Sequence, residues 1–301
     1  MKKAIITSIL IALLGLFSPP AIRATSNSSA QEIYSSLRRL EKSSRQITDN
    51  EKAIKFTQAF DEYLEESRPQ NRLRSYSDAD LLAVFNASDL ATFYSFEPRH
   101  ALFMESVLNE LNRRDLATPQ QWSYLSGAFI QSRMFSRAIE IRSAHELSSQ
   151  QELPTLVMAA TKFPYEWTPD KKENKLTLQN LDLPKGPSIL IFAHPLCHFT
   201  QNALRDIENS PQIRTIFKIK AKLLVPPSRT FDLSAVQDWN RDHQSQQMNF
   251  AFSRQQLPNF QYWETPAFYF LLDGEIVDTV VGWPKEGHID QLILAAHKIG
   301  L

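Results

Sequence analysis

The residues of this chain that can do chemistry gather around one cysteine. Cys197 is the only cysteine among 301 residues; His194 and His198 flank it, and Thr200 follows three positions later. An apolar run at 188–192 precedes the cysteine and a helical pattern follows it, which predicts a buried strand leading into a helix with the thiol at its N-terminus. Unpaired N–H groups and the helix dipole favour a thiolate there. The alternative is a small buried side chain without chemistry.

Two neighbours of Cys197 are expected to stabilise its thiolate. The Thr200 hydroxyl lies one helical turn away and can donate a hydrogen bond to the sulfur. His198 would add a positive charge as an imidazolium, although an exposed polar residue without a role has the same pattern. A single cysteine excludes a self-contained dithiol cycle and an internal disulfide. The thiol is therefore expected to be free or to bridge to another molecule.

A metal site is the second chemistry that these residues permit. His194, Cys197 and His198 are ligand types that copper and zinc accept. Pro195 prevents a regular helix from aligning the two histidines, so an envelope copper carrier is kept only as a lesser alternative. The chain contains no phosphate-binding loop, no G-x-S-x-G elbow and no H-E-x-x-H pair. No cofactor is predicted.

The elements that must position the cysteine follow from the rest of the C-terminal half. Thr265-Pro266 precedes an apolar run at 267–272, and Asp273-Gly274 joins that run to a second β-rich run at 275–282. Asp-Gly between two such runs is the strongest short hairpin signal. An amphipathic helix then closes the chain. The predicted order is strand, thiol, helix, strand, helix, Thr-Pro, hairpin, helix.

This order resembles the thioredoxin fold. The resemblance covers residues 176–301 and is carried by Phe192, Cys197-x-x-Thr200, Thr265-Pro266, the Asp273-Gly274 hairpin and Gly282. It implies a central mixed sheet flanked by helices, with Pro266 in the cis form and its loop facing the cysteine. It also implies that the backbone of this loop pairs with an extended substrate peptide, with Trp263 and Trp283 as candidate contacts.

Three departures from the family pattern bear on the activity. Thr200 stands where many members have a second cysteine, so a mixed disulfide must be resolved by an external thiol or be kept. Leu196 stands where many members have tryptophan, and Ile191 where many thioredoxins have a buried acid. The resemblance therefore implies either monothiol thiol–disulfide exchange through Cys197 or a degenerate module that only binds and assembles other proteins.

The fold class predicted is α+β with two domains, an all-α helical domain at 25–160 and an α/β thioredoxin-like domain at 161–301. Apolar residues three and four apart mark the helices of the first domain, where Gly127 is the only glycine. Thr118-Pro119 is typical of a helix start. Residues 119–147 have the spacing of one tetratricopeptide helix pair, but stacked repeats need about three units, so a generic helical hairpin is expected.

Weaker patterns give the remaining segments. They predict a loop at 70–76, an aromatic connector at 163–167, short strands at 176–178 and 181–183, a polar helix at 232–248 and a connector at 250–260.

The N-terminus predicts export. Lys2 and Lys3 precede an apolar run at 4–17 that is too short to span a bilayer, and small residues follow, so residues 1–24 are expected to be a signal peptide. An uncleaved anchor is the alternative, because Ile22 stands where a small residue is preferred. The mature protein is expected to be periplasmic or secreted, without stable membrane insertion.

The balance of charge limits the partners. The chain has 33 basic and 33 acidic residues, and it has no long basic run, so nucleic acid is not an expected partner. Expected partners are envelope proteins with disulfides or thiols, or extended peptide segments. The sequence leaves the oligomeric state open.

Overall fold

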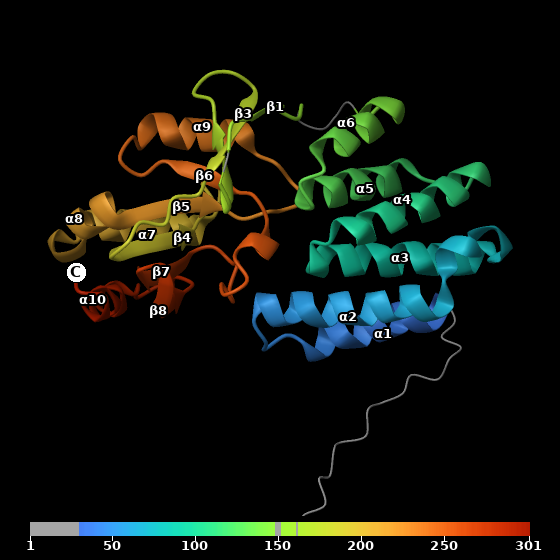
Figure 1. The fold of residues 1–301 in the computed structure, drawn as a ribbon, viewed down its shortest axis with the longest axis horizontal. Helices are drawn as coiled ribbons and strands as arrows, with labels where there is room; N and C mark the ends of the chain where they lie inside the picture. The colour runs from blue at the N-terminus through green and yellow to red at the C-terminus, as the bar shows by residue number, and fades with distance from the viewer. Residues whose placement is uncertain (1–29, 148–151, 161) are drawn as a thin grey trace, which may run out of the picture.

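The computed structural model describes residues 30–147, 152–160 and 162–301. Figure 1 shows two parts side by side, a stack of helices and a sheet with helices packed against it. The predicted α+β architecture, all-α first and α/β second, is confirmed. The signal peptide predicted at 1–24 lies outside the described residues. In the described part of the chain, no helix is long and apolar enough to cross a membrane.

Two helices of the helical half begin at capping boxes. Its helices are α1 (Ala30–Ser43), α2 (Asp49–Ser67), α3 (Asp78–Ser95), α4 (Pro98–Arg113), α5 (Pro119–Gln131) and α6 (Phe135–Ala144). At α2, the Thr48 hydroxyl accepts from the Glu51 N–H, and the Glu51 carboxylate accepts from the Thr48 N–H, which is a capping box. Thr118 and Gln121 form the same arrangement at α5, as the Thr-Pro pair predicts.

The helices enclose one apolar core around α3. Phe56 and Phe60 from α2, Phe85 from α3 and Phe129 from α5 are all at most 1% exposed. Full burial of a side chain of this size stabilises the fold by about 1.5–3 kcal/mol. The α5–α6 hairpin adds Trp122 to this core. Trp122 and Phe129 are therefore packed inside the stack and are not a free binding surface.

A polar row is enclosed between α2 and α4. The ring of His100 is fully buried, with Nδ1 2.8 Å from the Ser95 hydroxyl oxygen and Nε2 2.9 Å from a carboxylate oxygen of Asp61. Arg99 donates two further hydrogen bonds to Asp61. Burial lowers the pKa of His100, and this outweighs the Asp61 carboxylate, which raises it. Because Ser95 is itself buried, the row is structural, with a neutral imidazole joining the two helices.

The C-terminal half is built on an eight-stranded mixed sheet in the order β1-β3-β2-β6-β5-β4-β7-β8. Its strands are β1 (Thr155–Met158), β2 (Tyr165–Pro169), β3 (Lys175–Asn180), β4 (Pro187–Phe192), β5 (Ala221–Val225), β6 (Met248–Ala251), β7 (Ala267–Leu272) and β8 (Glu275–Val281). β4 lies parallel to β5 and antiparallel to β7. Asp273 and Gly274 turn β7 into β8 with φ angles of 54° and 86°, the left-handed values of a type I′ turn. The predicted hairpin is confirmed.

Strand β4 is buried on both faces. Ile189 and Ile191 belong to the main core, which is continuous with the core of the helical half. Leu190 and Phe192 belong to a second core on the opposite face of the sheet. Helices α7 (His198–Asn209), α8 (Pro211–Lys220), α9 (Leu233–Asp242) and α10 (Ile289–Lys298) add their apolar residues to the main core. The second core is covered by the non-helical segment 257–263, which brings that segment beside the end of β4.

The helix predicted at 232–248 is wrong in its second half. α9 ends at Asp242, and Met248 begins β6. The side chain of Asn240 binds both backbone groups of Met248, accepting from its N–H at 2.7 Å and donating to its carbonyl at 2.9 Å. These bonds turn the chain back beside β5, where Met248 and Phe250 are buried. Hydrophobic spacing contains no signal for such a bond between a side chain and the backbone.

Three shorter predictions also differ from the structure. The connector at 163–167 contains most of β2, because Trp167 is buried and the strand pairs with both β3 and β6. The strand predicted at 181–183 is not formed, since β3 ends at Asn180. The loop at 70–76 contains two short 3₁₀ turns, and Arg114 donates to the Leu73 and Arg74 carbonyls of the second turn.

Polar contacts join the two halves. Arg229, in the segment after β5, donates to the carboxylate of Asp89 at 2.5 Å, to its carbonyl at 2.7 Å and to the side-chain oxygen of Gln131 at 3.2 Å. A Cβ atom added to Gly127 on α5 would lie 3.1 Å from Cβ of Arg229. The lone glycine of the helical half therefore marks the point where the segment after β5 packs closely on α5.

A second arginine, on the helical half, binds the backbone of the C-terminal half. Arg133, which follows α5, donates to the carbonyls of Ala251 at 2.6 Å and Phe252 at 2.8 Å, at the end of β6. Ala251 is the last residue of the strand and Phe252 follows it, so the arginine binds carbonyls at the place where the strand ends.

Candidate functional site

Cys197 lies where β4 leads into α7, and it is the N-cap residue of that helix. Its side chain is half-buried. The Cys197 N–H donates to the His194 carbonyl at 3.0 Å, which closes a tight turn after the strand. The Cys197 carbonyl accepts from the Gln201 N–H at 3.0 Å and starts the helix. The sulfur is therefore held over the first turn of α7, where the backbone N–H groups have no partner within the helix.

Burial and hydrogen bonding act in opposite directions on the pKa of Cys197. Burial raises the pKa, but hydrogen bonds from Thr265, from the N–H and hydroxyl of Thr200 and from the Phe199 N–H lower it, and the lowering prevails. In the thiol form, the sulfur donates to the Thr265 carbonyl at 3.2 Å. The surroundings of the sulfur thus favour the thiolate, which is the nucleophilic form.

The structure places the two predicted neighbours of the sulfur differently. The Thr200 side chain is fully buried, and its hydroxyl faces the cysteine and also accepts from the His194 N–H at 3.5 Å. His198 is exposed, and its ring lies against Phe199 with the ring centres 3.9 Å apart. The Thr200 hydroxyl therefore lies against the Cys197 sulfur, whereas the His198 ring packs on Phe199.

His194 faces an acid that the sequence pattern does not point to. Its Nδ1 accepts from the Leu196 N–H at 3.2 Å, and its Nε2 lies 3.8 Å from the Asp232 carboxylate. Burial lowers the pKa of His194, and the Asp232 charge opposes this. Among the described residues, no three His, Cys, Asp or Glu side chains are placed to hold a metal ion. The metal alternative built on His194, Cys197 and His198 has no support in this geometry.

The loop before β7 completes the site. The Thr265–Pro266 peptide bond is cis, as the resemblance implies, and its Thr265 carbonyl meets the cysteine sulfur. The Pro266 carbonyl accepts from the Gly282 N–H at 2.8 Å, which joins the loop to the end of β8. The C-terminal half has a thioredoxin-like fold. The order of its elements along the chain and this loop opposite the cysteine are as the sequence and the resemblance predict, and the sheet adds the strand order β5-β4-β7-β8.

Comparison with known proteins adds little to this assignment. No protein-family model and no curated protein matches the chain. A solved structure described as a thioredoxin-like protein from Bacteroides caccae is similar over 93% of this chain and 99% of that chain, at 13% sequence identity and a TM-score of 0.30. A TM-score this low does not establish a common fold, so the assignment rests on strand order and site geometry.

The two tryptophans predicted to contact a peptide are core residues of the thioredoxin-like half. Trp263 is 3% exposed, with its ring stacked on Phe192 at 4.2 Å and its Nε1 donating to the Phe260 carbonyl. Trp283 is 4% exposed and donates to the Asp206 carboxylate. Trp263 still forms part of the wall beside the cysteine.

An open pocket of about 400 Å³ gives access to the sulfur. Its walls come from four segments that the fold brings together: His194, Leu196, Cys197, Pro226, Pro227, Ser228, Arg254, Trp263, Glu264 and Thr265. Sequence reasoning missed Arg254, which stands in a segment without a motif, and Glu264, which lies directly before Thr265-Pro266 but is not part of that motif. Their charges are the only signal, and only the fold places them beside the cysteine.

The helical half supports the wall formed by these two residues. The Asp49 carboxylate, at the start of α2, accepts from the Trp263 N–H at 2.8 Å. The guanidinium carbon of Arg254 lies 3.7 Å from the centre of the Phe96 ring, at the end of α3. The next residue, Gln255, donates to the Phe96 carbonyl at 3.1 Å. The pocket is thus shaped by both halves of the chain.

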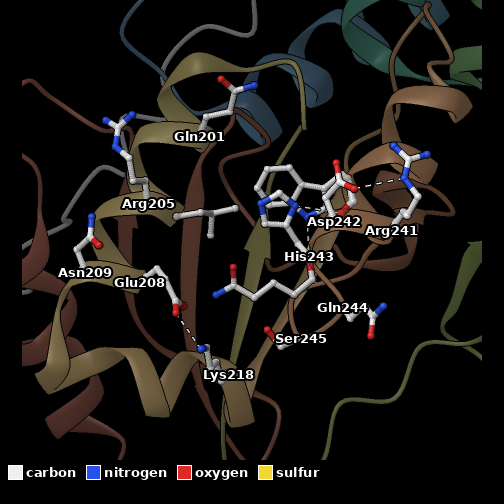
Figure 2. Close-up of a pocket in the computed structure, with 13 residues that line it drawn as sticks. Gln201, Arg205, Glu208, Asn209, Lys218, Arg241, Asp242, His243, Gln244 and Ser245 are labelled. Carbon is white, nitrogen blue, oxygen red and sulfur yellow. Dashed lines mark hydrogen bonds and ion pairs between the residues drawn. The ribbon is translucent and has the colours of Figure 1, made fainter.

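A larger cavity of about 840 Å³ lies elsewhere, between α7 and the end of α9, and Figure 2 shows it. Lys218 pairs with Glu208 at 2.9 Å, and Arg241 pairs with Asp242 at 3.3 Å. Cys197 is not among its lining residues. The candidate site is the smaller pocket, because it is the one that reaches the cysteine.

Proposed function

We propose that this protein is exported and exchanges thiols and disulfides through the single thiol of Cys197. The Cys197 thiolate attacks one sulfur of a partner's disulfide. A bond forms between the two sulfurs, the partner's own S–S bond breaks, and its second sulfur leaves as a thiolate. An external thiolate then attacks the partner's sulfur in the mixed disulfide, so that a disulfide forms between the external thiol and the partner and Cys197 leaves as a thiolate. A second external thiol completes the reduction of the partner by displacing the first.

The observation that carries this proposal is the lowered pKa of a half-buried thiol that an open pocket reaches. Thr200 replaces a resolving cysteine with a hydroxyl that stabilises the thiolate but cannot displace a disulfide. Envelope proteins with disulfides or thiols are the proposed partners, and their extended segments would lie along the backbone at Thr265 and Pro266. Mixed disulfides with such partners are expected to last until an external thiol arrives.

Binding without catalysis is the second candidate, and one observation favours it. Leu196 and Phe199, on either side of Cys197, are 63% and 46% exposed. Two large apolar side chains beside an opening form a contact surface for another protein. In this case the cysteine would be part of that surface and not a nucleophile.

The pH dependence of Cys197 alkylation separates the two candidates. Only the thiolate reacts, so the midpoint of the rate reports the pKa of the sulfur. We expect the folded protein to have a midpoint clearly below that of the urea-unfolded chain, which is about 8.5. An equal or higher midpoint in the folded protein would refute thiol exchange and leave the binding role. Cys197→Ser, which has no other thiol to label, is the blank.

A further inference from the structure

The Cys197 pocket contains a cation without a counter-ion. Arg254 lines the pocket, and its side chain is half-buried. Its Nε atom is buried and has no hydrogen-bond partner. Within the described residues, no carboxylate forms an ion pair with Arg254 and no acceptor binds its guanidinium. Burial lowers the pKa of Arg254 to about 10, so the group is still charged at neutral pH.

Two acidic side chains, Asp49 and Glu264, lie near Arg254, but neither neutralises its charge through an ion pair. The Asp49 carboxylate acts on Arg254 through its charge but accepts its hydrogen bond from the Trp263 N–H. Glu264 lines the same pocket, where burial and the Asp49 charge raise its pKa. Neither carboxylate comes within ion-pair distance of the guanidinium. An unpaired charge that has lost part of its hydration gains more from an added anion than a fully solvated one does.

The guanidinium is held in place by aromatic rings. It lies 3.7 Å from the Phe96 ring centre and 5.3 Å from that of Trp263. Such contacts hold the group by its faces and leave the terminal NH₂ donors, rather than the buried Nε, for a ligand. A planar fork of donors matches a carboxylate, which can accept two parallel hydrogen bonds.

We propose that Arg254 selects partners in which a carboxylate lies close to the sulfur that Cys197 attacks. This inference rests on the proposed exchange function and names its preferred substrate as an acidic disulfide. Two sources carry this chemistry: a small disulfide with carboxylate groups, or a protein whose half-cystine has an acidic neighbour. Arg254 binds the carboxylate while the thiolate attacks, and it takes no part in the electron transfer.

Three small disulfides of similar size test the proposal on the folded protein. They are 3,3′-dithiodipropionate, which is anionic, bis(2-hydroxyethyl) disulfide, which is neutral, and cystamine, which is cationic. The rate of mixed-disulfide formation is followed by mass. The ratio of the anionic to the neutral rate is then compared with the same ratio for the urea-unfolded chain, which cancels the intrinsic reactivities of the disulfides. We expect the folded protein to raise this ratio by about tenfold, the worth of one charged hydrogen bond.

Variants assign the effect to one side chain. Arg254→Gln should lose the anionic preference, read as the ratio of the anionic to the neutral rate, so that any change common to both disulfides cancels. Arg254→Lys should keep part of the preference. Arg205→Gln removes an exposed arginine of α7 that does not line the pocket, so its ratio should not change.

The outcomes separate this inference from the exchange function. If the neutral disulfide reacts and the folded protein shows no anionic preference, or Arg254→Gln keeps it, the inference is overturned and exchange stands. If no disulfide reacts with the folded protein, both are overturned. A disulfide-linked peptide with Asp beside its half-cystine, compared with the same peptide carrying Asn, identifies the source. A preference for Asp indicates protein partners, and a preference confined to dithiodipropionate indicates small disulfides.

Discussion

The thiol of Cys197 combines access with stabilisation of its charge, and each comes from a different neighbour. The pocket on one side leaves the sulfur half-exposed, while Thr200 on the other side is fully buried beneath it. A buried hydroxyl has little competition from water, so its hydrogen bond to a thiolate is worth more than one at the surface. Thr200 is therefore a residue at which substitution should change the reactivity of the sulfur.

We predict that Thr200→Val slows alkylation of Cys197 at pH 7 by about tenfold, because one hydrogen bond to the charged sulfur is lost. Valine keeps the shape of the side chain and the backbone N–H. Thr200→Ser, which keeps the hydroxyl, should react within about twofold of the parent on the same scale. Equal rates for the valine variant and the parent would show that the backbone N–H groups alone stabilise the thiolate.

His100 gives the molecule an acid-sensitive point away from the site. Burial holds its folded-state pKa below the usual 6.5, so above pH 6.5 the ring is neutral in both states. As the pH falls below 6.5, the unfolded chain binds a proton that the folded protein does not, and the free energy of unfolding decreases. The decrease is complete once the pH is below the folded-state pKa.

The variant His100→Gln tests this prediction. Urea unfolding at pH 7 and at pH 5 should show a smaller loss of stability for His100→Gln than for the parent protein. His145 and His194, whose pKa values burial also lowers, are present in both proteins and cancel in the comparison. An equal pH dependence would place the acid sensitivity at those residues instead.

Residues in a local motif could be predicted, and residues brought in by the fold could not. Cys197, Thr200, Thr265 and Pro266 stand in short patterns whose meaning is set within a few positions of the chain. Arg254 reaches the pocket only because the segment after β6 covers the second core. No local pattern encodes that placement.

At the scale of elements, the start of α2 links helix stability to the pocket. Thr48 caps the helix, and the next residue, Asp49, holds the Trp263 N–H. We predict that Thr48→Ala lowers the free energy of unfolding by about 1 kcal/mol, measured by urea unfolding. Thr118→Ala, at the equivalent cap of α5, should have a similar effect on stability. Of the two, only Thr48→Ala should also change the rate of Cys197 alkylation.

Elements with explicit start, stop or turn residues were predictable from the sequence. Thr118-Pro119 starts α5, and Asp273-Gly274 turns β7 into β8. Strand β6 was not, because its place depends on the bond between Asn240 and Met248 and on burial beside β5. A four-residue strand has too few side chains to show a period.

At the scale of the whole molecule, Arg229 joins the halves through an ion pair with Asp89 and further hydrogen bonds. We predict that Arg229→Met lowers the free energy of unfolding by about 2–3 kcal/mol, because Asp89 loses its partner in a partly buried place. Far-ultraviolet circular dichroism and tryptophan fluorescence, followed through a urea titration, should report the change. Arg241→Met, which removes an exposed ion pair, should change stability by less than about 0.5 kcal/mol.

The contacts between the two halves also predict how the protein responds to cleavage of the chain that connects them. A protease that severs the chain between α6 and β1 would break one covalent link and leave the bonds of Arg229, Arg133 and Asp49 in place. The two pieces should therefore stay together through gel filtration and keep the reactivity of Cys197. The piece that carries the sheet, purified alone, would lose the ring of Phe96 behind Arg254. We expect this piece to keep its thiol and to lose the preference for anionic disulfides that is proposed for Arg254.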